Sequence, residues 1–130
     1  MFKKIILTIL LTISVNAFSH EGHDSTPGSL KTNHGGVVQA GKVFNLEYVV
    51  VGSEVKLYPA SHEGLDLSVN EVTVAVTSKL PKGKATVLKT DVINSAIVTK
   101  VDFQKAYRLE INVDASFKNQ KSAFKFQVEK

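Results

Sequence analysis

The chain has 130 residues, of which 16 are basic and 12 are acidic, and it contains no cysteine. Without cysteine it has no disulfide bond, no thiolate metal site and no cysteine nucleophile, and it cannot carry the lipid of a lipoprotein. Its formal net charge is +4, but the lysines are spread among acids. This spread argues against a nucleic-acid-binding face, which needs concentrated basic side chains.

The N-terminus has the pattern of a bacterial secretory signal peptide over residues 1–19. Lys3 and Lys4 form the positive region, residues 5–13 form an apolar run, and small residues follow it. The run is too short for a stable membrane-spanning helix. We therefore expect an exported protein, periplasmic or secreted. An uncleaved amphipathic anchor is the alternative interpretation.

Residues 20–36 differ in composition from everything that follows them. The segment is rich in polar residues, glycine and histidine, and it ends with the run HGG at residues 34–36. A segment with so few apolar side chains cannot bury a core, so it predicts a flexible arm. Its first five residues are His20, Glu21, Gly22, His23 and Asp24.

From residue 37 to the C-terminus the sequence predicts one all-β domain. Five runs alternate apolar and polar residues with period two, which places one face on a core and the other in water. These runs are residues 44–50, 55–57, 72–76, 107–113 and 124–128, and weaker strands fit at 36–40, 85–90 and 96–103. Seven to eight short strands separated by turn signals favour an antiparallel, immunoglobulin-like β-sandwich.

Two details of this fold follow from the same alternation. Leu109 is predicted to face the core, and the strand acids Glu47, Glu54 and Glu110 are predicted to be solvated. Tyr107 opens a late strand, where a tyrosine either bonds back to the corner backbone or packs as an ordinary core aromatic.

No pattern in the chain predicts catalytic machinery. There is no phosphate-binding glycine loop, nucleophile elbow or helical zinc-protease motif, so we expect that the protein is not an enzyme. The informative residues are the four histidines, all of which fall outside the predicted strands. Imidazoles beside carboxylates suit Cu(II), Ni(II) and Zn(II). The candidate metal ligands are His20, Glu21, His23, Asp24, His34 and His62.

The two expected cleavage sites both create a chelating N-terminus. Cleavage after Ser19 makes His20 the first residue, so that its amine and imidazole bind one metal ion together. Cleavage after Ala17 places His20 third, where amine, backbone nitrogens and imidazole form a square plane suited to Cu(II) or Ni(II). The competing interpretation is a polar linker without metal, with His34 as a turn residue and His62 as a solvated loop residue.

The chain resembles a small periplasmic domain that accompanies heavy-metal efflux systems and their adaptor subunits. The similarity rests on residues 34–38 (HGGVV), 44–49 (FNLEYV), 55–58 (VKLY) and 62–67 (HEGLDL). There is a looser similarity to periplasmic copper-binding sandwiches that use an N-terminal histidine. The resemblance implies a β-sandwich linked to copper, zinc, cobalt or nickel. The only methionine is Met1, which favours Cu(II), Zn(II) or Ni(II) over Cu(I).

Two functions remain open at this point. The first is an exported metal-binding protein for heavy-metal handling or efflux, with Cu(II) as the preferred ion and a periplasmic efflux adaptor as a potential partner. The second is a non-metal periplasmic interaction module that docks on a membrane complex through a sheet edge or loop.

Overall fold

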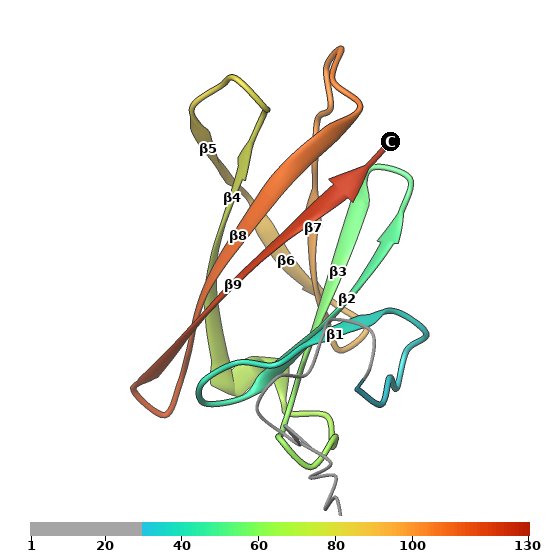
Figure 1. Ribbon diagram of the computed structural model, residues 1–130. Helices are drawn as coiled ribbons and strands as arrows, with labels where there is room; N and C mark the ends of the chain where they lie inside the picture. Colours follow the sequence, from blue (N-terminus) through green and yellow to red (C-terminus); the bar gives the residue numbers. More distant parts are fainter. Residues whose placement is uncertain (1–29) are drawn as a thin grey trace, which may run out of the picture.

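The computed structural model describes residues 30–130, so the predicted signal peptide and the segment up to Ser29 lie outside the described residues. The described part is almost entirely β-structure (Figure 1). Its elements are β1 (Val37–Gln39), β2 (Asn45–Val51), β3 (Glu54–Ala60), a single 3₁₀ turn η1 (Val69–Glu71), β4 (Val72–Lys79), β5 (Ala85–Leu88), β6 (Thr90–Ile93), β7 (Ala96–Lys100), β8 (Arg108–Phe117) and β9 (Gln120–Glu129).

The strands form two antiparallel sheets. One has the order β1-β2-β3-β7-β6 and the other has the order β5-β4-β8-β9. The run β2-β3-β7-β6 corresponds to strands A-B-E-D of an immunoglobulin domain, and β4-β8-β9 corresponds to C-F-G. The remaining strands, β1 and β5, add one edge to each sheet. The predicted immunoglobulin-like sandwich is confirmed, with nine strands in the described residues instead of seven to eight.

The core lies between the two sheets and follows the predicted alternation. In β9 every second residue from Ser122 to Val128 is buried, and its neighbours are exposed. In β8, Leu109 is almost fully buried, as predicted. Aromatic rings join the sheets, because Tyr48 of β2 stacks on Phe126 of β9 with ring centroids 3.8 Å apart. Burial raises the pKa of the Tyr48 hydroxyl.

The single strand predicted over residues 85–90 is wrong. The chain forms β5 in one sheet, crosses at Lys89, and continues as β6 in the other sheet. The Thr99 hydroxyl donates to the Lys89 carbonyl at 2.9 Å, which holds the crossover against β7. Tyr107 is exposed, so it is not the core aromatic of one interpretation, and its carbonyl accepts from the Lys130 amide.

On one side of the sandwich, side-chain hydrogen bonds link β1 to the outer edge of β9. The Gln39 side chain bonds both backbone groups of Lys125: its Oε1 accepts from the Lys125 amide at 3.2 Å, and its Nε2 donates to the Lys125 carbonyl at 3.0 Å. Nearby, the Val43 amide donates to the Ser122 hydroxyl at 2.8 Å. A side chain therefore occupies the positions that an added strand would use at this point of β9.

Candidate functional site

The first candidate site is built where residues 33–36, which we call the arm root, lie across β2. The Glu47 carboxylate accepts three backbone N–H groups: Asn33 at 2.9 Å, His34 at 2.9 Å and Gly36 at 2.8 Å. Charge-assisted bonds of this kind are roughly twice as strong as neutral ones. The segment predicted as an arm over residues 20–36 is thus attached to the sandwich at its described end.

The burial of Glu47 differs from the prediction made from the sequence. It was predicted to be solvated, yet only 2% of it is exposed. The alternation was right, because Leu46 beside it faces the core and Glu47 points to the other face of the sheet. The carboxylate is buried because the arm root covers it, which strand periodicity cannot reveal.

Glycine is required where the arm root approaches β2. A Cβ on Gly36 would lie 2.2 Å from the Tyr48 carbonyl oxygen, far inside contact distance. The preceding Gly35 has a φ of +74°, a conformation that favours glycine. The HGG run predicted as the end of the arm therefore works as a close-approach segment.

Gly36→Ala is expected to destabilise the mature protein by about 1–3 kcal/mol, because the new methyl group pushes the arm root off β2. Urea unfolding followed by circular dichroism measures the loss, and amide exchange should rise at residues 33–36. The control is Gly83→Ala, where the nearest atom is a side-chain carbon 3.1 Å away. Equal stability of the two variants would contradict the close approach.

The His34 side chain is held by two partners, Tyr58 and Asp66. Its ring stacks on Tyr58 of β3, with centroids 3.7 Å apart and an interplanar angle of 10°. Its Nε2 lies 2.9 Å from Asp66 Oδ2, and the Asn33 side chain donates to Asp66 Oδ1 at 3.2 Å. Because an ionised carboxylate only accepts, Nε2 carries the hydrogen and the lone pair of the neutral ring is on Nδ1. His34 and Asp66 are both partly exposed.

A small cavity adjoins this pair. Its volume is about 300 Å³, and its lining includes His34, Tyr58, Asp66, Asn70 and Ser95. The cavity thus presents an imidazole, a carboxylate, an amide and hydroxyl groups at one place. Apolar residues, Pro59, Leu67 and Val69, line other parts of it.

His62 has a separate partner. Its Nε2 lies 3.0 Å from the Gly41 carbonyl, in the loop between β1 and β2. The neighbouring Glu63 has a pKa below its usual value, because a backbone N–H and the Ser61 hydroxyl bond its carboxylate and His62 lies close by. His62 is therefore engaged with the sandwich, away from the Asp66 carboxylate that holds His34.

The described residues do not themselves form a complete metal site. Between residues 30 and 130, no three or more His, Asp or Glu side chains lie close enough together to hold an ion. The other candidate ligands, His20, Glu21, His23 and Asp24, lie outside the described residues. Tyr58 and Asp66, which hold His34, were not among the predicted site residues, although Asp66 belongs to the HEGLDL run at residues 62–67.

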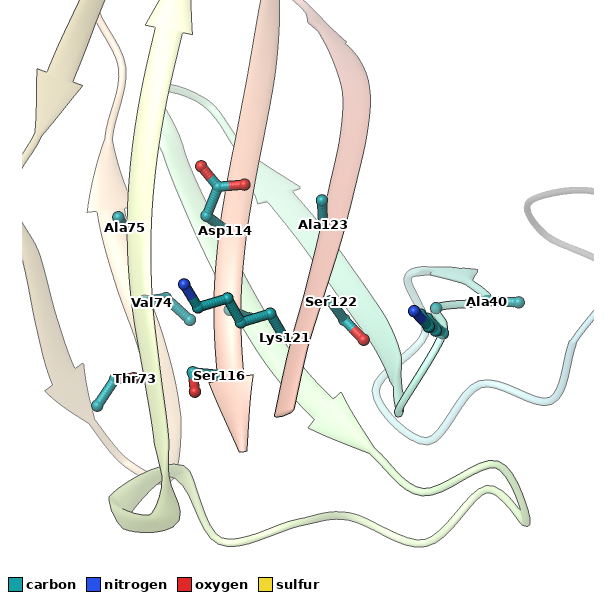
Figure 2. Close-up of a pocket in the computed structure, with 12 residues that line it drawn as sticks. Ala40, Thr73, Val74, Ala75, Asp114, Ser116, Lys121, Ser122 and Ala123 are labelled. Carbon is teal, nitrogen blue, oxygen red and sulfur yellow. The ribbon is translucent and has the colours of Figure 1, made fainter. Parts of the chain in front are cut away.

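A larger cavity lies elsewhere, over β4, β8 and β9 beside the loop at residues 40–42 (Figure 2). It measures about 830 Å³, and small side chains such as Ala75, Ser116 and Ala123 line much of it. Figure 2 shows the Lys121 side chain extending from β9 toward β4, below Asp114. No predicted site residue lines this cavity.

Within residues 30–130, no helix has the length and apolar character needed to cross a membrane. Comparison of the chain with models of protein families, with curated proteins and with solved structures gives no match.

Proposed function

We propose that this chain is an exported metal-binding protein that takes part in handling or efflux of copper, nickel or zinc. Its ligands are the N-terminal His20, His23 and neighbouring carboxylates, carried on the β-sandwich. The supporting observation is the His34–Asp66 pair, an oriented imidazole at the place where the ligand-rich segment joins the domain. A periplasmic efflux adaptor is the proposed recipient of the ion.

The chemistry of the pair agrees with this proposal. Histidines that ligate metals usually donate their second ring N–H to a carboxylate, which fixes the tautomer and makes the ligating nitrogen more basic. The bond from His34 to Asp66 has this form. Residues 24–34 span up to roughly 35 Å when extended, so the reach of the chain allows His20 and His23 to return to His34.

Cu(II) is the proposed ion because the intrinsic affinity of nitrogen ligands for copper exceeds that for nickel and zinc. The ligands must lose their protons to bind. Affinity is therefore expected to fall as the pH drops through the histidine range near about 6.5.

Calorimetric and visible-absorption titration of the mature protein with Cu(II) tests the proposal. After intact-mass analysis establishes a terminus at Phe18 or His20, wild type is compared with His20→Ala/His23→Ala and with a protein carrying one extra N-terminal residue. Both changes should weaken binding, since the first removes imidazoles and the second moves the amine away from His20. Asp66→Asn should weaken it by roughly tenfold if His34 is a ligand.

Equal binding by all these proteins would overturn the metal function, and so would the absence of binding above a histidine-free control peptide. The second candidate function, an interaction module, would then remain. The observation that favours this module is the side of the sandwich formed by β5 and β6, whose outer edges pair with no strand of residues 30–130.

A further inference from the structure

The two sides of the sandwich differ in how their edge strands are covered. Gln39 blocks the edge of β9 at Lys125, but β5 and β6 are the terminal strands of their sheets on the opposite side. We call residues 85–93 the open flank; Figure 1 shows β5 at the margin of the molecule beside β4. Within residues 30–130, no strand pairs with the outer edge of either β5 or β6. Free backbone N–H and C=O groups along such an edge are a template for another chain.

The open flank also exposes apolar side chains. Val87 is 80% exposed, Val92 is 55% exposed and Ile93 is 50% exposed. These three residues are β-branched and lie in strands, where such side chains pack well against a neighbouring strand. Backbone groups and apolar surface are therefore unpartnered at the same place.

The charge beside β5 indicates which kind of strand would pair with it: a second copy of this chain or a strand of another protein. Residues 79–90 contain Lys79, Lys82, Lys84 and Lys89 and no acidic residue, and the next acid along the chain, Asp91, belongs to β6 and not to β5. If two copies paired their β5 strands about a two-fold axis, Lys84 of each copy would oppose Lys89 of the other. Like charges opposite one another destabilise a strand pair, so the edge of β5 disfavours a second copy and favours an acidic strand.

We propose that β5 binds an extended, acidic segment of a partner protein as an added strand. The partner's backbone would bond the edge of β5, an apolar side chain would cover Val87, and its carboxylates would lie near Lys84 and Lys89. Strand addition of this kind takes affinity from main-chain bonds and specificity from alternate side chains. With only four residues in β5, the contact is short and the complex is expected to be transient.

The probe is the synthetic peptide acetyl-Glu-Thr-Val-Thr-Val-Glu-amide, titrated into the ¹⁵N-labelled mature protein at low ionic strength. Amide chemical shifts are expected to change at residues 84–89, and added salt should weaken the effect. A peptide methylated on alternate backbone nitrogens should not bind, because it cannot form the strand ladder. Shifts centred elsewhere, or equal binding by the methylated peptide, would overturn the proposal.

Exchange of charge provides the sharper comparison. Lys84→Glu/Lys89→Glu should reduce affinity for the acidic peptide by about tenfold and raise affinity for its lysine-flanked counterpart. The matched control, Lys118→Glu/Lys121→Glu, reverses two lysines at the β8–β9 turn and should leave both affinities unchanged. If the two double variants behave alike, net charge explains the binding and the proposal fails.

This proposal does not depend on the metal function. His20→Ala/His23→Ala removes proposed copper ligands and should bind the acidic peptide as wild type does. Failure of copper binding and failure of strand addition therefore appear in separate titrations. A loss of peptide binding in this variant would contradict the assignment to β5.

Discussion

Glu47→Ala is expected to lower the free energy of unfolding by about 3–4 kcal/mol. The substitution removes the acceptor of three backbone N–H groups, from Asn33, His34 and Gly36, and leaves them without a partner beside β2. Bonds to a charged group contribute about 1.5–3 kcal/mol each, and release of the arm root to water recovers part of the sum. Urea unfolding of the mature protein, followed by far-ultraviolet circular dichroism, measures the change.

Two further variants separate the role of Glu47 from a general effect of lost charge. Glu54→Ala removes a carboxylate from β3 whose ion pair with Lys56 is 3.9 Å long and partly exposed, and it should cost less than about 1 kcal/mol. Glu47→Gln keeps the shape and one acceptor oxygen, so its cost should fall between the two. Amide exchange at residues 33–36 should rise most in Glu47→Ala. A Glu47→Ala protein as stable as Glu54→Ala would show that the arm root is not held by this carboxylate.

Leu109→Ala is the second large effect, with an expected cost of about 2–5 kcal/mol. Leu109 lies on β8 in the cluster that contains Leu46, Leu57 and Phe126, and it is almost fully buried. Truncation removes apolar contacts and leaves a cavity that the two packed sheets cannot fully close. The same unfolding measurement applies, and the midpoint should fall without a change in the denaturant slope.

Arg108→Ala is the matched control for this prediction. Arg108 is the neighbouring residue on β8, with an exposed side chain, so its truncation should change stability by no more than about 0.5 kcal/mol. Because the residues are adjacent, the pair tests the face assignment directly. A larger loss for Arg108→Ala than for Leu109→Ala would reverse the assignment.

The sequence predicted the fold wherever local pattern decides it. Alternation placed Leu109, Phe124, Phe126 and Val128 on the core face, because a strand turns successive side chains to opposite faces. The same alternation predicted the wrong structure at Lys89, where the chain passes from one sheet to the other although the sequence on both sides is typical of a strand. Such a crossing depends on which strands pair, and a window of a few residues holds no information about pairing partners.

The candidate site was less predictable for the same reason. His34 and His62 were identified by residue type, but their partners Asp66, Tyr58 and Gly41 lie far from them along the chain. Glu47 was read as a surface acid because its burial depends on residues 33–36 folding over it. Sequence reasoning finds groups with suitable chemistry, whereas the contacts that orient or bury them are tertiary.

The side chain of Gln39 has a consequence for assembly. Repeated strand pairing through one sheet needs two free edges of that sheet, one to join the unit before it and one to receive the next. In the sheet formed by β5, β4, β8 and β9, the Gln39 amide already saturates Lys125 at one end. A further strand cannot bond Lys125 at this point of β9, so Gln39 disfavours repeated strand pairing through this sheet.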